Sequence, residues 1–302
     1  NPPGYFVGLH FWMQILGNTD LAARSLSMLF GMAAIPLLYV IGVRLAGKAA
    51  GLFSAFLLAI STLPVFYSTE ARMYAMYLFL TLAAVWFYLN LEERREKNLS
   101  SRAARVGFFL ACSLLVWTHI TAWMILLAIA VYIFWKSRWN PGKCIRNHRN
   151  FFIILFLLGI QLLPWLVTFV SEKFGSSIFG GYLFYIPPDR NYFISILETF
   201  LVFGQHNAFI VTLLSVVSAG LLLMAFRRPW SRRTWFLASW LFVPLLIGFV
   251  FSNAVPRYFI AVAPAFYLLL GVGFSRWLKE GPFKLRKTVL TIPLIFFSLI
   301  LT

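Results

Sequence analysis

The sequence predicts an all-α membrane protein: a bundle of about ten transmembrane helices plus one helix along the outer membrane surface. Three observations indicate this class. Hydrophobic residues fill 61% of the 302 positions and charged residues only 12%, which is too apolar for a soluble domain. Long apolar runs alternate with short basic clusters, and no internal repeat is detectable. We therefore expect one transmembrane domain over residues 1–302.

The apolar runs define the individual spans. A spanning helix needs about 20 apolar residues, or somewhat fewer where aromatic and basic residues anchor its ends. The region 104–135 is divided in two at residues 118–121, because a single helix there would place the flanking basic loops on opposite sides of the membrane. The predicted spans are 22–43, 48–63, 72–90, 104–118, 121–135, 151–170, 208–226, 235–251, 257–274 and 288–302.

Two segments outside these spans have features of their own. Residues 2–17 are short, apolar and rich in aromatic side chains, and the turn signal Gly17–Asn18 follows them, so they predict the surface helix. Residues 171–207 form the only long connection, and a loop of this length usually has a function. His206 near its end would meet either a sugar's hydroxyls or water.

The distribution of charge predicts the sidedness. In this topology 21 of the 26 Lys and Arg residues fall on one side, which is therefore the cytoplasmic side. The basic residues occur as clusters between apolar runs, so the lipid bilayer and not nucleic acid is the expected partner of the positive charge. The outer side holds five of the nine acidic residues: Asp20, Glu70, Glu172, Asp189 and Glu198.

The stretch "FYSTEARMY" places a carboxylate and a guanidinium between two apolar runs, in a short external loop. Glu70 would either complement the positive end of the next helix or take part in chemistry. Arg72 would either extend to lipid head groups or bind an anion. Two residues apart, these side chains are not expected to pair with each other. Tyr67 and Tyr74, which flank them, are further candidate pocket residues.

A second basic residue lies at the outer boundary in "NAVPRYF", where Arg257 follows a proline and Tyr258 opens the next span. A guanidinium with an adjacent tyrosine hydroxyl suits a phosphate whose lipid tail lies between helices. The alternative is a membrane-surface anchor with an interfacial tyrosine. His119, at the external turn of "WTHITAW", would be a metal ligand, a phosphate donor or an interfacial histidine with no task.

Four segments taken in order carry a resemblance to a known family: "NPPGYF", "LAARSLSMLFGMAAIPLLYVIGVRLAG", "YSTEARMYA" and "PRYFIAVAPAFYLLLGVG". They resemble membrane glycosyltransferases related to dolichyl-phosphate-mannose protein mannosyltransferases, of the GT-C type. Bacterial members of this family include the aminoarabinose transferase and the galacturonic-acid transferases that act on lipid A. The resemblance is densest over residues 1–92 and returns at 252–275.

The resemblance implies an inverting transferase that takes a sugar from a polyprenyl-phosphate carrier at the outer face of a bacterial inner membrane. The acceptor would be a glycolipid, a cell-wall polymer or a protein. The family's general base is an Asp in the first external loop, which would precede Asn1 together with the first span. Glu70 matches the second acidic residue and would orient the acceptor or a divalent metal ion. Arg257, Tyr258 and Arg72 would hold the donor phosphate. Members often carry His or Lys where this chain has Asn1.

Two other functions remain open from the residues alone. In a secondary transporter or lipid flippase, Glu70 would be a coupling carboxylate, although such acids normally lie near the bilayer midplane and Glu70 falls at a boundary. In a lipid-linked oligosaccharide polymerase or ligase, the connection 171–207 would carry the chemistry. It holds just two basic residues.

Overall fold

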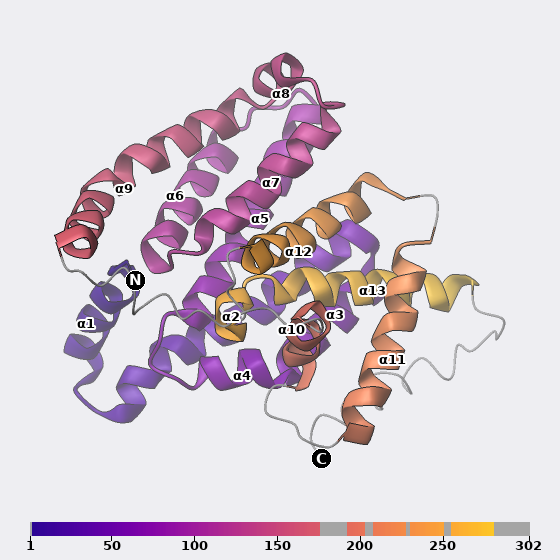
Figure 1. Cartoon of the computed structure of the whole chain (residues 1–302), viewed down its shortest axis with the longest axis horizontal. Coiled ribbons are helices and arrows are strands. Elements are labelled where there is room, and N and C mark those ends of the chain that lie inside the picture. The colour runs from indigo at the N-terminus through magenta and orange to yellow at the C-terminus, as the bar shows by residue number, and fades with distance from the viewer. Residues whose placement is uncertain (1, 176–191, 203–207, 228–229, 251–254, 281–302) are drawn as a thin grey trace.

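The chain folds into a bundle of helices (Figure 1). The computed structural model describes residues 2–175, 192–202, 208–227, 230–250 and 255–280, and no strand occurs among them. The predicted all-α class is thereby confirmed. The helices are α1 (Gly4–Leu16), α2 (Asp20–Ala46), α3 (Lys48–Ile60), α4 (Thr62–Ser68), α5 (Tyr74–Glu96), α6 (Arg102–Thr118), α7 (Ala122–Lys136), α8 (Pro141–Asn147), α9 (Arg149–Gly175), α10 (Tyr192–Val202), α11 (Ala208–Ala225), α12 (Arg232–Val250), the short 3-10 helix η1 (Pro256–Phe259) and α13 (Ala263–Glu280).

Nine of the ten predicted spans coincide with helices, and the tenth, 288–302, lies outside the described residues. The division of 104–135 is confirmed, because α6 ends at Thr118 and α7 begins at Ala122. The predicted span 48–63 is a bent pair of helices instead of one continuous helix. The chain breaks at Ser61, whose backbone is extended, and α3 and α4 meet at a bend of 58°. Residues 192–202 of the expected long connection are helical as well.

This is a multi-pass membrane protein. In the part of the chain that the structure describes, α2, α5, α11 and α12 are each long and apolar enough to cross a membrane. The number rises to six if the bent pairs α3–α4 and α7–α8 each form one span. The higher count of about ten stays a prediction, because several helices that match predicted spans are too short or too charged to qualify alone.

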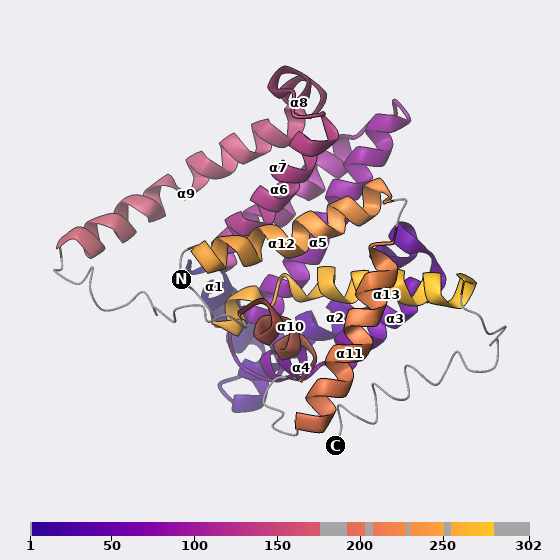
Figure 2. The same ribbon diagram turned by 45° about the vertical axis from the view of Figure 1, so that its right-hand side comes forward.

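The centre of the bundle consists of α2, α3 and α13, which lie side by side in both views (Figures 1 and 2). Small residues allow this close approach. A Cβ on Gly42 of α2 would lie 2.6 Å from the Cα of Gly51 in α3, and a Cβ on Gly51 would lie 2.7 Å from the carbonyl oxygen of Tyr39. Ser54 of α3 donates a hydrogen bond to the carbonyl oxygen of Tyr267 in α13, 3.0 Å away.

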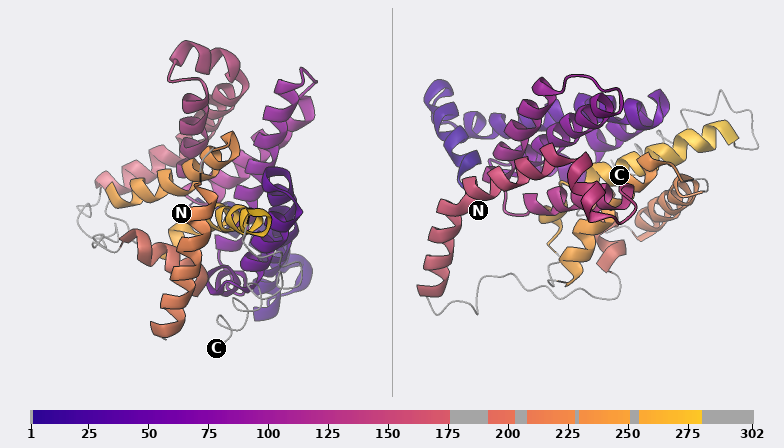
Figure 3. Two further views of the ribbon diagram at one scale, coloured as in Figure 1. Left: turned by 90° about the vertical axis from the view of Figure 1, so that its right-hand side faces the viewer. Right: turned by 90° about the horizontal axis from the view of Figure 1, so that it is seen from above.

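The remaining helices pack around this centre. α5 contacts both α2 and α6, α12 contacts α7 and α13, and α11 packs on α13. α9 runs along the edge of the bundle beside α6, and its far end projects away from the other helices (Figure 3). Among the helices of the first half of the chain, α5 therefore lies centrally in space, with neighbouring helices on several sides.

Ion pairs join helix ends at one end of the bundle. Arg44, at the end of α2, pairs with Glu93 of α5. Lys136, at the end of α7, lies 2.5 Å from the carboxylate of Glu92. Arg233 at the start of α12 donates to the carbonyl oxygen of Leu45, 3.0 Å away. The basic loops after α2, α5 and α7 and before α12 were predicted to share one side of the membrane. In the structure, the four helix ends next to these loops lie together.

Candidate active site

At the opposite end of α5, aromatic side chains from two elements, α5 and η1, surround His119. The imidazole stacks on Tyr77 of α5 with ring centroids 4.8 Å apart and planes inclined by 22°. Tyr74, one turn earlier on the same helix, has its ring centroid 5.6 Å from that of His119. Tyr258 of η1 approaches from another side, also at 5.6 Å. The turn between α6 and α7 therefore contacts both the start of α5 and η1, the short helix that precedes α13.

Thr121 links this aromatic cluster by hydrogen bonds. Its hydroxyl oxygen lies 2.7 Å from Nδ1 of His119, 3.0 Å from the hydroxyl of Tyr77 and 3.4 Å from the carbonyl oxygen of Tyr258. The backbone N–H of Thr121 donates to the same Nδ1 at 3.2 Å. Because Nδ1 accepts this bond, the hydrogen-bond network assigns the proton of the neutral ring to Nε2. Nε2 is buried and has no hydrogen-bond partner among the described residues.

The charge state of His119 follows from its burial. The side chain is 0% exposed, and burial lowers its pKa to about 3, with the nearby positive charge of Arg257 acting in the same direction. The ring is therefore neutral at physiological pH. Its unpaired Nε2–H is a buried hydrogen-bond donor at the candidate site.

Arg257 supplies the positive charge at this position. Its guanidinium carbon lies 5.5 Å from the centre of the Tyr258 ring, in a cation–π arrangement. The hydroxyls of Tyr74, Tyr258 and Tyr67 lie within electrostatic range of the guanidinium. Tyr67 joins the group through its ring, 4.6 Å from that of Tyr74. The structure thus gathers three of the predicted site residues, all tyrosines, around the half-buried cation of a fourth, Arg257.

Glu70 and Arg72 lie in the connection between α4 and α5, directly before Tyr74. The connection is tight, since the N–H of Arg72 donates to the carbonyl oxygen of Glu70 at 2.7 Å. The half-buried Glu70 carboxylate makes no hydrogen bond or ion pair with any residue in the described ranges. The two side chains do not pair, as predicted. Arg72 is exposed, and its charge, like that of Arg257, acts on the hydroxyl of Tyr74.

Helices α1 and α2 hold this connection in place. Ser27 of α2 donates to the carbonyl oxygen of Arg72 at 3.1 Å, and the hydroxyl of Tyr5 in α1 lies 2.8 Å from that of Ser27. Arg24 donates to the carbonyl oxygen of Thr69 at 3.4 Å. The backbone that carries Glu70 is therefore tied to two helices that precede it in the sequence.

The start of α1 lies beside the end of α6. A Cβ on Gly4 would lie 2.6 Å from the carbonyl oxygen of Trp117, so only glycine fits at this contact. The two prolines before Gly4 consequently enter the bundle next to the His119 turn. Asn1 and His206, the remaining predicted site residues, lie outside the described residues.

The described residues contain no group of three or more His, Cys, Asp or Glu side chains able to hold a metal ion. Glu70 stands alone among them as a carboxylate at the candidate site. A divalent metal ion at Glu70 stays a prediction, and no step of the chemistry below passes through it.

Several residues of the site were missed by sequence reasoning, chiefly Thr121, Tyr77, Ser27 and Tyr5. Tyr77 had a detectable signal, because it lies three positions after Tyr74 and so shares its helix face. Thr121 lies in the polar break of the run 104–135. Ser27 and Tyr5 lie among apolar residues on long helices, where nothing in the sequence marks their partners.

Comparison with known proteins adds the family. A family model described as dolichyl-phosphate-mannose-protein mannosyltransferase matches residues 1–168, more than half of the chain. The chain belongs to this family. The matched residues include α1, the α4–α5 connection with Glu70 and the His119 turn, so the mannosyltransferase-family match covers most of the candidate site. No curated protein sequence matches the chain.

Solved structures share the fold of this mannosyltransferase-family chain. ArnT from Cupriavidus metallidurans in the apo state matches with a TM-score of 0.66 at 15% identity, over 90% of this chain and 49% of ArnT. The same protein bound to undecaprenyl phosphate matches with a TM-score of 0.64 at 17% identity, over 90% and 49% of the two chains. The Archaeoglobus fulgidus oligosaccharyltransferase tethered with an acceptor peptide matches at 0.61 and 16% identity, over 99% and 46%. The chain therefore spans about half the length of these solved relatives.

Proposed function

We propose that this protein is an inverting glycosyltransferase that moves a sugar from a polyprenyl-phosphate carrier to a lipid, cell-wall polymer or protein acceptor at the outer face of a bacterial inner membrane. Membership of the mannosyltransferase family supports the class of reaction. A structure of similar fold that binds undecaprenyl phosphate supports the class of carrier. The basic loops predict the orientation, with Glu70 and Arg257 on the side that faces the periplasm.

The observation that carries this proposal is the position of Arg257. Its guanidinium is held against the Tyr258 ring, within electrostatic range of Tyr74 and Tyr67, the two tyrosines that flank the connection bearing Glu70. Arg257 and Tyr258 belong to η1, whereas Tyr74 belongs to α5, so the fold brings segments from the two halves of the chain together. A half-buried cation with adjacent hydroxyls is suited to a lipid-borne phosphate at the membrane boundary.

The proposed reaction is a single displacement. The acceptor hydroxyl forms a bond to the anomeric carbon while the bond from that carbon to the phosphate oxygen breaks, and the polyprenyl phosphate leaves as an anion. A carboxylate base takes the proton of the acceptor hydroxyl. Arg257, with the Tyr258 hydroxyl and Arg72, stabilises the negative charge that develops on the leaving phosphate. Glu70 orients the acceptor near the base, which the family resemblance places upstream of Asn1.

The test uses the full-length protein in detergent with a polyprenyl-phosphate sugar and measures the release of polyprenyl phosphate. We expect Glu70→Gln to lower turnover at least about tenfold, or roughly 1.4 kcal/mol in barrier, because the amide cannot carry the negative charge. Asp20→Asn is the matched control. Asp20 is an exposed acid at the start of α2, and its replacement should leave turnover within about twofold.

Unchanged turnover in Glu70→Gln would remove Glu70 from the mechanism. Movement of the lipid-linked sugar across proteoliposomes, without any transfer to an acceptor, would instead favour a flippase or transporter.

A further inference from the structure

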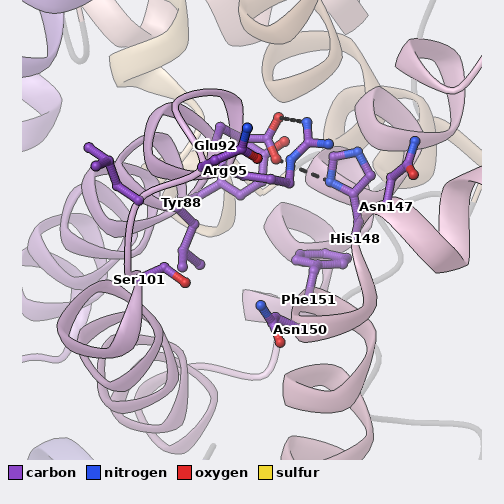
Figure 4. A pocket seen from close by; sticks show the side chains of 11 residues that line it. Tyr88, Glu92, Arg95, Ser101, Asn147, His148, Asn150 and Phe151 are labelled. Atoms are coloured by element: carbon purple, nitrogen blue, oxygen red, sulfur yellow. Dashed lines mark hydrogen bonds and ion pairs between the residues drawn. The ribbon is translucent and has the colours of Figure 1, made fainter.

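A polar cavity of about 250 Å³ lies at the other end of α5, between the α5–α6 connection and the α8–α9 junction (Figure 4). Tyr74 and Glu92 lie 18 positions apart on α5, which corresponds to about 27 Å along a helix. The cavity is therefore separate from the candidate active site. Its polar lining consists of Tyr88, Glu92, Arg95, Asn98, Ser101, Asn147, His148 and Asn150.

Two residues that line this cavity each carry a buried hydrogen-bond donor without a partner among the described residues. Tyr88 is 1% exposed, and its hydroxyl is buried without a hydrogen bond to any described residue. The Nε–H of Arg95 is buried and unpaired in the same way. A buried donor left unsatisfied costs about 1–3 kcal/mol, so such groups usually meet water or a bound group. Two of them beside one cavity point to a ligand that accepts hydrogen bonds.

The acidic group of the cavity is already occupied. The carboxylate of Glu92 accepts from Lys136 at 2.5 Å, from Arg95 at 3.1 Å and from Nδ1 of His148 at 3.1 Å. Figure 4 shows the Arg95 and His148 contacts converging on this carboxylate. Three donors of the protein therefore already surround the Glu92 carboxylate, and two of them are permanently cationic side chains. The unpaired Nε–H of Arg95 can only donate a hydrogen bond, so this group favours an acceptor over a cation.

Three arginines lie next to residues of the cavity lining in the sequence. Arg102, Arg146 and Arg149 are exposed, adjoin residues of the lining in sequence, and form no ion pair with any described acidic residue. α6 begins at Arg102 and α9 at Arg149, so the amino ends of two helices adjoin the cavity. Helix amino ends favour anions through their free N–H groups and dipole. The charge and the unpaired donors thus select the same ligand class.

We propose that this cavity binds a phosphate group, with the Tyr88 hydroxyl and the Arg95 Nε–H donating to its oxygens. The phosphate is either that of an anionic lipid head group at the membrane boundary or that of a small soluble compound. Both sources present the same acceptor oxygens, and the cavity volume suits a phosphate with one small substituent.

The test uses the full chain in neutral detergent and follows the shift in unfolding temperature on titration with inorganic phosphate, at an ionic strength held constant with chloride. A second arm places the protein in nanodiscs of phosphatidylcholine with or without phosphatidylglycerol and counts retained lipids by native mass spectrometry. We expect Tyr88→Phe to weaken phosphate or phosphatidylglycerol binding about fivefold and Arg95→Gln about tenfold or more. Tyr39→Phe, a half-buried tyrosine of α2 outside this lining, is the matched control and should bind as the wild type does.

Tyr88→Phe removes a hydroxyl that has no protein partner, so without ligand it should unfold at the same temperature as the wild type or above it. A response to inorganic phosphate and to phosphatidylglycerol supports the proposal with either source, and a response to the lipid alone assigns the head group. The proposal is overturned if neither ligand has a saturable effect, or if Tyr88→Phe and Arg95→Gln bind as tightly as Tyr39→Phe. Sugar transfer is not part of this readout, so the result is independent of the proposed enzymatic function.

Discussion

His119 stacks on Tyr77 at 4.8 Å, and Thr121 hydrogen-bonds both side chains. This contact joins the turn between α6 and α7 to the start of α5. The same threonine reaches the carbonyl oxygen of Tyr258 in η1. The Thr121 hydroxyl therefore holds together three segments that form the candidate active site. This site and the packing of α2 against α3 lead to four predictions.

Thr121→Val should destabilise the protein. The change keeps the side-chain volume but removes the hydroxyl, which weakens the hydrogen bonding of His119 and Tyr77 in a buried site. We expect a loss of about 1–3 kcal/mol, seen as a lower unfolding temperature in detergent. Thr81→Val on α5 is the matched control, because the Thr81 hydroxyl is buried without a partner among the described residues and its loss should be neutral or stabilising. Equal effects of the two changes would contradict this role for Thr121.

Arg257→Gln should impair use of the lipid-linked donor. The amide removes the positive charge that we propose meets the phosphate, so kcat/KM for the polyprenyl-phosphate sugar should fall about 30-fold or more, roughly 2 kcal/mol. Arg257→Lys should recover only part of the loss, since lysine keeps the charge but not the planar fork. Arg105→Gln, an exposed arginine near the start of α6, is the control. A wild-type kcat/KM in Arg257→Gln would exclude Arg257 as the phosphate ligand.

Burial of neutral His119 should make stability depend on pH. Its folded pKa of about 3 lies below the usual value of about 6.5, so the unfolded state binds the proton first as the pH falls. The stability is fully present above about pH 6.5 and is lost progressively between pH 6.5 and 3. By pH 5 the loss should reach about 2 kcal/mol.

Unfolding temperatures at pH 7.5 and pH 5 measure this effect. His119→Asn should flatten the difference between the two conditions. His10→Asn alters an exposed histidine of α1 and should retain the wild-type difference. If His119→Asn loses as much stability on acidification as the wild type, another group causes the pH dependence.

Gly42→Ala tests the contact between α2 and α3. The added Cβ would meet the Cα of Gly51 at 2.6 Å, so the helices must move apart, and we expect a loss of at least about 2 kcal/mol. Gly220→Ala is the comparison within α11. A Cβ there meets nothing within 4 Å, and alanine should stabilise that helix by up to about 1 kcal/mol. A neutral result for Gly42→Ala would show that α2 and α3 are not tightly packed.

Much of the fold was predictable because membrane helices are marked by local composition. The positions of α2, α5 and the α6–α7 turn followed from apolar length and loop charge. The break at Ser61 did not, since nothing in the run 48–63 interrupts its apolar character strongly enough to locate a bend of 58°. The helix α10 was also missed, because the turn residues around it made the whole connection look irregular.

The candidate site was predictable only in part. Arg257, Tyr258 and Tyr74 stood out because polar groups at the ends of apolar runs are few. Their mutual proximity is a property of the fold, since Thr121 and the Tyr258 carbonyl meet across 137 positions of sequence. Thr121 itself offered only a weak signal.

The sequence by itself determined that this chain is a multi-helix membrane protein and which family it resembles. It also determined which charged residues are expected on the side of the membrane opposite the basic loops. These are properties of composition and short motifs, which act locally. The tertiary structure decided that His119 is a neutral, buried part of the wall and that Arg257 lies among tyrosines. It also decided that Tyr88 and Arg95, which line a second cavity, each carry an unpaired hydrogen-bond donor. Burial and pairing depend on helices distant in sequence, and no local pattern encodes those contacts.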